Sequence, residues 1–217
     1  MRYVDLSHTI HDGMITYKGL PAPIICDFYS RDESIRFYDG DTSFQIGQVT
    51  MVGNTGTYMD CPFHRFKDGK DFSELFLSDM ADLDGIRISV PHFESLSIEK
   101  EHLSGLDVRG KAVLLHTGWD QFWRQDQYFE NHPFLSKTAA EYLRSQQVKV
   151  VGIDSHNMDD TRGKTRPAHT ILLEAGILVV EHLCQLHLVP ANGFYFTAVP
   201  PRIKGTGSFP VRAFAKF

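Results

Sequence analysis

The stretch NTGTYMDCPFH, residues 54–64, places an aspartate and a histidine four positions apart around a Cys-Pro pair. Asp60 and His64 are residue types that bind a divalent cation through a carboxylate oxygen and a ring nitrogen. Gly56 permits a tight backbone approach and Pro62 fixes a φ angle, so we expect a rigid turn. Two ligands do not make a metal site, and the same pair could instead cap a turn and form one surface hydrogen bond.

A second stretch, RPAHTILLEAGILVVEHL (166–183), adds two more candidate ligands. His169 falls at the start of a predicted helix, and Glu181 falls at the carboxyl end of a predicted buried strand, where α/β proteins commonly place ligand groups. An ionised carboxylate buried there costs several kcal/mol unless a cation or hydrogen-bond donors meet it. A structural salt bridge is the alternative explanation, with Arg162, Lys164 and Arg166 as candidate partners.

The elements that position these residues are predicted from hydrophobic periodicity. FQIGQVTMV (44–52) alternates apolar and polar residues, as a half-buried strand does, whereas continuous β-branched runs are typical of strands buried on both faces. Those runs are 111–117, 148–154 and 175–183, with further strand candidates at 3–7 and 193–200. Helices are predicted at 137–147, where Thr138 and Glu141 are spaced like a capping box, and at 168–175. The sequence therefore predicts a single α/β domain, residues 1–217, with a mixed sheet.

The bulk composition excludes several classes of protein. Hydrophobic residues make up 42% and charged residues 23% of the 217, values close to those of ordinary globular proteins. The net charge is −5 and the 22 basic residues are scattered, so we expect no nucleic-acid partner. No apolar run is long enough to span a membrane, and the start, MRYVDLSHTI, lacks the pattern of a signal peptide. We therefore expect a cytoplasmic protein without a membrane partner.

The chain resembles the cyclase-like amidohydrolase family, which includes bacterial kynurenine formamidase and isatin hydrolase. Five stretches carry the resemblance, and in chain order they are DLSHTIHDGMITYKGLP, GTYMDCPFH, VLLHTGWDQFW, GIDSHNMDD and AHTILLEAGILVVEHLCQL. The resemblance implies a compact β/β/α domain of the swivelling type. It also implies a homodimer or homotetramer and one or two divalent metals that activate water for hydrolysis of an amide or lactone.

The resemblance also implies a set of ligands. The family signature is HxGTHxDxPxH, and Asp60 and His64 match its aspartate and its last histidine. His169 and Glu181 stand where the family has its later metal ligands. These four residues could hold one Zn²⁺ or Mn²⁺ and leave a position for water.

The chain departs from the signature at two positions. Asn54 and Tyr58 replace the first and second histidines, both of which are metal ligands in the family. An amide offers only a neutral oxygen, and a phenol with a pKa of about 10 is a poor ligand near neutral pH. We therefore expect one metal and no second. His156 is a possible replacement ligand, with a surface hydrogen bond to Asp159 or Asp160 as the alternative.

The expected function is hydrolysis of a small-molecule amide, formamide or lactone by a metal-activated water. His64 or Glu181 could serve as the base, and Tyr58 could donate a hydrogen bond to the oxyanion. Two alternatives remain open. The first is a metal-free, catalytically inactive homologue that binds a small molecule, and the second is a cysteine hydrolase that uses Cys61 with His64.

Aromatic residues could form the wall of the substrate pocket. Phe63 and Phe66 flank the signature, and Trp119 and Trp123 lie in TGWDQFWRQ. Flat side chains suit an aryl or heterocyclic substrate. Packing against the sheet is the alternative role for the same four residues.

Overall fold

A nine-stranded mixed sheet organises the chain, of which the computed structural model describes all residues, 1–217. Its order is β1 (Tyr3–Asp5), β13 (Phe214–Lys216), β11 (Phe194–Thr197), β5 (Leu83–Ser89), β7 (Ala112–His116), β9 (Val150–Ile153), β10 (Leu178–Glu181), β4 (Tyr58–Asp60) and β12 (Ser208–Pro210). The four central strands, β5, β7, β9 and β10, are parallel, and the flanking strands pair antiparallel. The predicted single α/β domain with a mixed sheet is confirmed.

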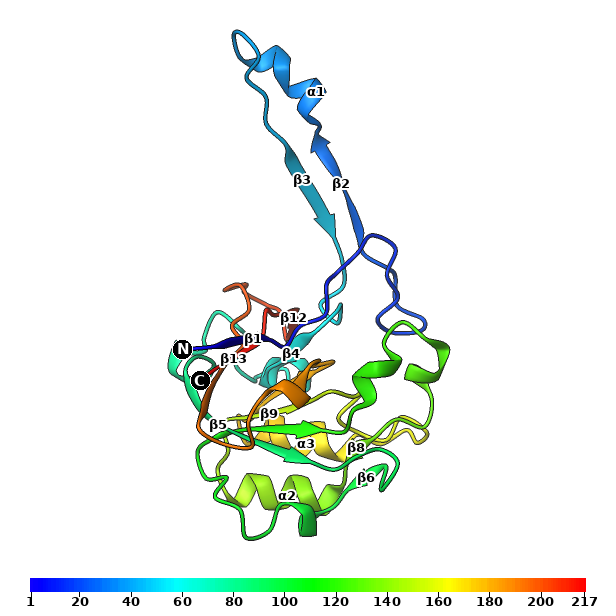
Figure 1. The fold of residues 1–217 in the computed structure, drawn as a ribbon, viewed down its shortest axis with the longest axis vertical. Helices are drawn as coiled ribbons and strands as arrows, with labels where there is room; N and C mark the ends of the chain where they lie inside the picture. The colour runs from blue at the N-terminus through cyan, green and yellow to red at the C-terminus, as the bar shows by residue number, and fades with distance from the viewer.

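Two helices, α2 (Lys137–Ser145) and α3 (Pro167–Glu174), lie together on one side of the sheet (Figure 1). Both match the predicted helices to within two residues at each end. The predicted capping box at Thr138 is wrong, because the N-cap of α2 is Ser136, two residues earlier. The side chain of Ser136 accepts a hydrogen bond from the backbone N–H of Ala139 and caps the helix.

Strands β7, β9 and β10 are buried on both faces, as their continuous apolar runs predicted. Strand β5 has no such run and was not predicted, and its Asp84 and Ser89 are exposed. In β7, Val113 and Leu115 enter the core that includes residues of α2 and α3, while Ala112 and Leu114 enter the core on the opposite face. This alternation follows from the two-residue period of a strand. A strand with a core on each side has no polar face, so its sequence shows no alternation.

The predicted strand at 44–52 exists, but its predicted burial is wrong for the single chain. Strand β3 (Ile46–Thr50) pairs only with β2 (Ile24–Tyr29), and every residue of β3 is exposed. With the short helix α1 (Arg31–Ser34), these strands form an arm, residues 24–50, that extends away from the rest of the molecule (Figure 1).

The remaining elements are short. A two-stranded parallel ladder joins β6 (Ser97–Ile98) and β8 (Phe134–Leu135). The 3-10 turns are Ile35–Phe37, Pro62–His64, Leu77–Asp79, Lys100–His102, Trp119–Phe122, Asp126–Phe129 and Leu186–Leu188. No helix combines the length and the apolar character needed to cross a membrane.

Candidate metal centre and active site

The pairing of β4 with β10 brings three of the predicted site residues onto one face of the sheet. Asp60 lies opposite Val179, and Tyr58 lies opposite Glu181. Directly opposed residues of an antiparallel pair project to the same face, and so do residues two apart on one strand. Val179 belongs to the core that includes residues of α3, so Tyr58, Asp60 and Glu181 also face that helix.

His169 reaches the same point from the first turn of α3. The carboxylate of Asp159 accepts hydrogen bonds from the backbone N–H groups of Ala168 (2.6 Å) and His169 (3.0 Å). The same carboxylate accepts a hydrogen bond from Nδ1–H of His169, at 2.6 Å. Asp159 therefore satisfies two free N–H groups at the helix start and fixes the ring so that its Nε2 faces the sheet.

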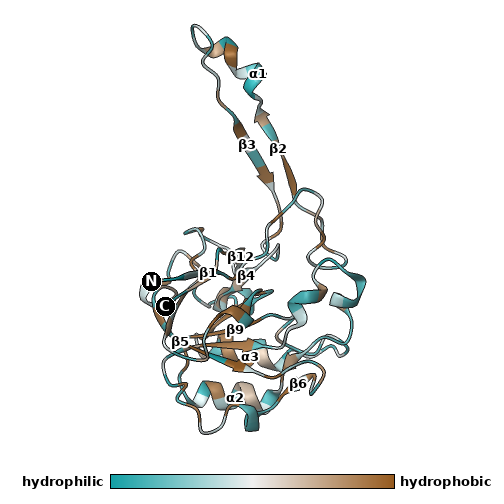
Figure 2. Cartoon of the chain, viewed as in Figure 1, coloured by the Kyte–Doolittle hydropathy of each residue, from teal (hydrophilic) through white to brown (hydrophobic).

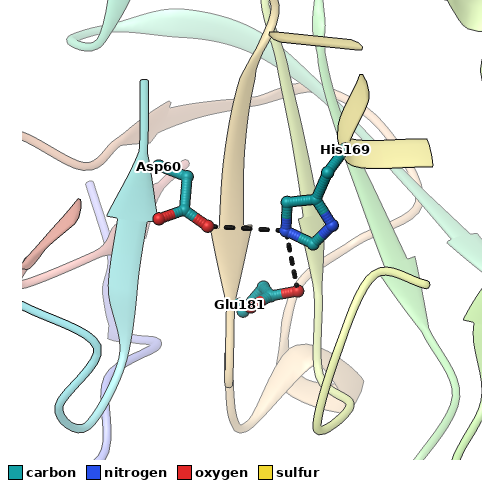
Figure 3. A group of neighbouring side chains, drawn as sticks. All are labelled: Asp60, His169 and Glu181. Atoms are coloured by element: carbon teal, nitrogen blue, oxygen red, sulfur yellow. Dashed lines mark ion pairs between the residues drawn. The ribbon is translucent and has the colours of Figure 1, made fainter. Parts of the chain in front are cut away.

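Asp60, His169 and Glu181 form a buried group with the composition of a metal site. Nε2 of His169 lies 3.5 Å from Oδ2 of Asp60 and 3.4 Å from Oε1 of Glu181 (Figure 3). One ligand atom from each residue lies within 4.8 Å of the other two. The Oδ2 atom of Asp60 is buried and has no hydrogen-bond partner. One imidazole nitrogen, two carboxylates and an unsatisfied oxygen fit a divalent cation such as Zn²⁺ or Mn²⁺.

The pKa values of His169 and Glu181 indicate that the group stabilises a positive charge between its carboxylates. Burial lowers the pKa of His169, but Glu181, Asp159 and Asp60 outweigh burial and raise it to about 10. Burial raises the pKa of Glu181 to about 7, although the charge of His169 opposes the rise. Because Nδ1–H is held by Asp159, the extra proton of His169 sits on Nε2, between the two carboxylates. That position, between His169 Nε2 and the two carboxylates, is the one that a bound cation would take.

Glu181 has partners other than those expected from sequence. The Tyr58 hydroxyl donates a hydrogen bond to its Oε2, and the backbone N–H of Met158 donates to its Oε1. None of Arg162, Lys164 and Arg166 forms a salt bridge with it, and His169 is its only ionic partner. Burial and the nearby Glu181 charge raise the pKa of Tyr58, so the phenol stays protonated and acts as a donor to Glu181.

His64 lies beside this group and outside it. Its Nδ1 is 3.7 Å from Oδ1 of Asp60 and 2.7 Å from Oγ of Ser208, and its side chain is 34% exposed. Ser208 Oγ donates its one proton to Asp60 and can therefore only accept from His64. Ser208 belongs to β12, which approaches closely because Gly207 precedes it. A Cβ at Gly207 would lie 2.3 Å from the backbone nitrogen of His64.

A cavity of about 450 Å³ opens onto the group. Six of the predicted site residues line it, namely Asn54, Tyr58, Asp60, His64, His169 and Glu181. Lining residues that the sequence did not single out for the site are Tyr17, Lys18, Gly19, Leu20, Arg65, Asn157 and Arg166. Three of these are basic, but Lys18 is paired with Asp126 at 3.3 Å, so Arg65 and Arg166 are the ones that give the cavity positive charge beyond the acidic group.

The four aromatic residues predicted for the substrate wall lie elsewhere. Phe63 and Phe66 pack against the two cores of the sheet. Trp119 is buried, and its Nε1–H donates to the carbonyl of Tyr128 at 3.1 Å. The ring of Trp123 stacks on His8 with 4.0 Å between centroids. None of the four lines the cavity, and packing against the sheet, the alternative role, is observed for Phe63 and Phe66.

Cys61 lacks the environment of a nucleophile. Its side chain is fully buried, and burial raises the pKa of the thiol to about 11. A thiol with that pKa is almost entirely protonated at neutral pH, and the nucleophile of a cysteine hydrolase is the thiolate. The structure therefore disfavours the cysteine-hydrolase alternative.

His8, His156 and His182 form a second group, in which the rings of His156 and His182 lie 5.7 Å apart. Burial lowers the pKa of His8 to about 4 and that of His156 to about 3, and it also lowers the pKa of His182. His156 is buried against Tyr17, with 4.3 Å between ring centroids, so the surface role considered for it is wrong. It does not belong to the Asp60 group.

Two functional residues were missed in the sequence. Asp159 was read only as a partner of His156, and it lies seven residues before the N-cap Arg166, so no local capping pattern marks it. Ser208 lies 144 residues from His64 and its neighbours suggest no role. Only the pairing of β12 with β4 brings it to Asp60.

Comparison with known proteins shows the family to which the chain belongs. The family model described as "Putative cyclase" matches residues 4–160. Kynurenine formamidase of Geobacillus thermodenitrificans is 32% identical over 203 residues, which cover 84% of this chain and 91% of the relative. Kynurenine formamidase of Bacillus cereus is 28% identical, with 97% and 95% covered.

Solved structures agree with these relatives over the whole chain. A structure described as a potential metal-dependent hydrolase with cyclase activity is 25% identical and has a TM-score of 0.79, with 99% of this chain and 96% of the other covered. Isatin hydrolase A from Labrenzia aggregata is 20% identical with a TM-score of 0.84, and 99% and 93% are covered. The second likeness shows the fold alone.

Proposed function

The chain belongs to the cyclase family, and from that premise we propose that it is a metal-dependent hydrolase of a small amide, a formamide or a cyclic amide or lactone. The observation that carries the proposal is the buried group of Asp60, His169 and Glu181 at a 450 Å³ cavity. The names of the sequence relatives, kynurenine formamidase, support a formamide or related amide as the substrate class.

One divalent cation, Zn²⁺ or Mn²⁺, would be held by Asp60, His169 and Glu181. A bound divalent cation lowers the pKa of water towards neutrality and polarises a carbonyl group. Asp159 holds the His169 ring in the tautomer whose Nε2 is available for binding once its extra proton leaves. Tyr58 occupies the place of a signature histidine and donates to Glu181, which leaves no second set of ligands.

His64 is the best placed general base. Since Ser208 Oγ can only accept from it, His64 carries its proton on Nδ1 and leaves Nε2 free to accept a proton from water. Both carboxylate oxygens of Glu181 already accept hydrogen bonds, so Glu181 is less available for proton transfer. His64 also lines the cavity and is partly exposed, as proton exchange with substrate and solvent requires.

Asn54 takes over the oxyanion role that the sequence suggested for Tyr58. The one proton of the Tyr58 hydroxyl is donated to Glu181 and is not free for a substrate oxygen. Asn54 lines the cavity, and its side-chain amide offers two N–H donors. Donors held in a water-poor cavity stabilise the negative charge that develops on a carbonyl oxygen under attack.

The cavity also indicates the charge of the substrate. Arg65 and Arg166 line it and form no salt bridge, and cationic side chains favour a ligand that carries a carboxylate away from the bond to be cleaved. Arg166 donates through Nη1 to three backbone carbonyls, so its position is fixed before a substrate arrives.

The replacement of two signature histidines by Asn54 and Tyr58 favours one competing function. A homologue that kept the cavity without binding metal would be a small-molecule-binding protein. The two functions differ in metal content, since the hydrolase binds one equivalent of a divalent cation and the binding protein binds none.

The deciding experiment uses protein purified without chelators and measures metal content and hydrolysis together. N-formylkynurenine, isatin and simple lactones are tested with and without added Mn²⁺ or Zn²⁺. We expect hydrolysis of at least one of them, lost after chelation and restored by the metal. Protein with no bound divalent ion and no activation by either metal would instead be the binding protein.

A further inference from the structure

The loop at residues 13–23 forms part of the cavity wall and belongs to no helix or strand. The backbone N–H of Gly13 donates to the carbonyl of Pro23 at 2.9 Å and closes the base of the loop. Compact loops of this length whose ends meet often carry function. No backbone–backbone hydrogen bond joins the loop to a residue outside 11–23. Side chains therefore hold the loop to the rest of the protein.

The first part of the loop, residues 13–16, is fixed by two buried side chains. Met14 and Thr16 are 7% and 5% exposed. The hydroxyl of Thr16 accepts a hydrogen bond from the backbone N–H of Gly56 at 2.8 Å. Gly56 belongs to the same signature stretch as Asp60. This part of the loop therefore has a set position relative to the proposed metal centre.

The tip of the loop, residues 17–20, is a turn whose four residues all line the cavity. The backbone N–H of Leu20 donates to the carbonyl of Tyr17 at 3.2 Å. Gly19, the third residue of the turn, has a φ of +93°, and a Cβ there would meet no atom within 4 Å. Glycine is therefore needed for its backbone angle and not for lack of space. The Tyr17 hydroxyl accepts a hydrogen bond from the side-chain amide of Asn157 at 2.5 Å, but no residue of the tip belongs to either core.

Lys18 attaches the tip to the turns at 119–130, which lie as green ribbon beside the dark blue loop (Figure 1). Its ammonium nitrogen lies 3.3 Å from Oδ1 of Asp126, 4.0 Å from Oε1 of Glu130 and 5.0 Å from the centroid of the Phe129 ring. Figure 2 shows that these turns are largely hydrophilic, unlike the central strands. The side chains of Lys18 and Asp126 are 53% and 94% exposed. Exposed ion pairs are weak and are screened by salt, so this attachment is easily broken.

Lys18 also separates two cavities. It lines the cavity of about 450 Å³ at the proposed metal centre, and it lines a second cavity of about 430 Å³. Met14 and Ile15 of the loop and Arg124 and Phe129 of the neighbouring turns line the second cavity too. A displacement of Lys18 would therefore join the two cavities and widen the entrance to the first.

We propose that residues 17–20 are a flap that opens and closes the cavity, and that the ion pairs of Lys18 with Asp126 and Glu130 hold it closed. The base of the loop stays in place while the tip moves about Gly19, which has access to backbone angles that other residues lack. Closure keeps water away from the metal centre, and opening lets a ligand enter and a product leave. The inference concerns access to the cavity, so it rests on the proposed function only for the identity of the ligand.

Chymotrypsin tests the flap without any assay of hydrolysis, because it cleaves after tyrosine and Tyr17 lies in the cavity wall. Cleavage after Tyr17 requires the tip to leave the cavity, so its rate follows the population of the open form. We expect Asp126→Asn combined with Glu130→Gln to raise this rate by about three- to fivefold, the factor that exposed ion pairs contribute. Mass spectrometry of the peptide that ends at Tyr17 measures the rate.

The matched control is Asp107→Asn, which removes an exposed ion pair, 3.1 Å from Lys111, outside the loop. Its rate of cleavage after Tyr17 should equal that of the wild type. Sodium chloride at about 0.5 M should raise the wild-type rate and leave the double variant nearly unchanged, after division by the rate on a small peptide substrate. An unchanged rate in the double variant, or an equal rise at cleavage sites outside residues 13–23, would overturn the flap.

A second arm of the experiment separates the flap from the proposed substrate class. N-formylkynurenine in large excess should slow cleavage after Tyr17, because a ligand in the cavity contacts the flap in its closed position. Cleavage that depends on the ion pairs but not on this ligand would support the flap and count against the substrate class. Cleavage that the ligand slows but the ion-pair substitutions leave unchanged would support the substrate class and overturn the role of Lys18.

Discussion

The histidine of the Asp60 group, His169, differs in charge from the group of His8, His156 and His182. His169 is surrounded by the carboxylates of Asp60, Asp159 and Glu181, which raise its pKa to about 10. His8, His156 and His182 have no such neighbours, and burial lowers the pKa of each. Burial alone disfavours an imidazolium ion, so it is the carboxylates that decide which histidine holds a positive charge. A group that holds a proton so tightly is also suited to hold a metal cation.

The largest effect is expected from Glu181→Gln. This change removes one of the two carboxylates in the group and keeps the size of the side chain. We expect loss of the bound metal and a fall in kcat/KM of about 10³-fold, equivalent to the several kcal/mol that a metal contributes to such reactions. Metal analysis and steady-state kinetics check it, and a variant that keeps both metal and activity would contradict the assignment.

His64→Gln should separate proton transfer from metal binding. Because His64 lies outside the three-residue group, we expect metal content to be unchanged and kcat to fall by about 10²–10³-fold. The same assay at several pH values should show that the variant has lost the ionisation of the base. Unchanged kcat would exclude His64 from proton transfer.

Asp159→Asn should weaken metal binding without removing one of the three proposed ligands. The amide keeps the size of the carboxylate but loses the charge that orients and polarises His169. We expect metal affinity to fall by about 10–100-fold, as for other residues that hydrogen-bond to a metal-binding histidine. Calorimetric titration measures the affinity, and wild-type affinity would show that the His169 ring needs no such support.

The pH dependence of metal binding follows from the raised pKa of His169. Its folded pKa of about 10 means that the metal-free site is protonated at pH 7, so the cation must displace a proton. Apparent affinity should therefore rise with pH below about 10, by up to about tenfold for each unit, and more steeply below about pH 7, where Glu181 must also lose a proton. Calorimetry in buffers of different ionisation enthalpy should detect proton release, whereas binding that is independent of pH would contradict the protonation state.

The smallest effect is expected from a change in the group of His8, His156 and His182. His156 has a buried Nδ1 without a partner, so His156→Leu removes an unsatisfied polar atom together with some contacts. The two effects oppose each other, and we expect the free energy of unfolding to change by about 1 kcal/mol or less. Metal affinity should be unchanged, and its loss would make His156 the replacement ligand considered from the sequence.

The sequence predicted the sheet well because its signal is local. Three of the four central strands are continuous apolar runs, and the runs at 111–117, 148–154 and 175–183 contain β7, β9 and β10. The fourth, β5, contains Asp84 and Arg87 and was not predicted. Asp60, His169 and Glu181 could be nominated because the family signature and the end of a buried strand both mark chemistry. Their convergence depends on the pairing of β4 with β10, which spans 121 residues.

The features that could not be predicted from the sequence depend on contacts between residues far apart in the chain and on the environment of each side chain in the fold. Ser208 has no local signal, and the direction of its hydrogen bonds decides the tautomer of His64. The sequence around Trp119 and Trp123 is the same whether these side chains face a substrate or a core, so it could not distinguish the two roles. The exposure of β3 was also invisible, because its alternation is that of a strand with one buried face.

Anomalous diffraction from a crystal grown with Mn²⁺ tests the central claim most directly. We predict a single peak within about 2.0–2.2 Å of ligand atoms from Asp60, His169 and Glu181. No peak there, or a metal bound only at other residues, would contradict the proposed metal centre.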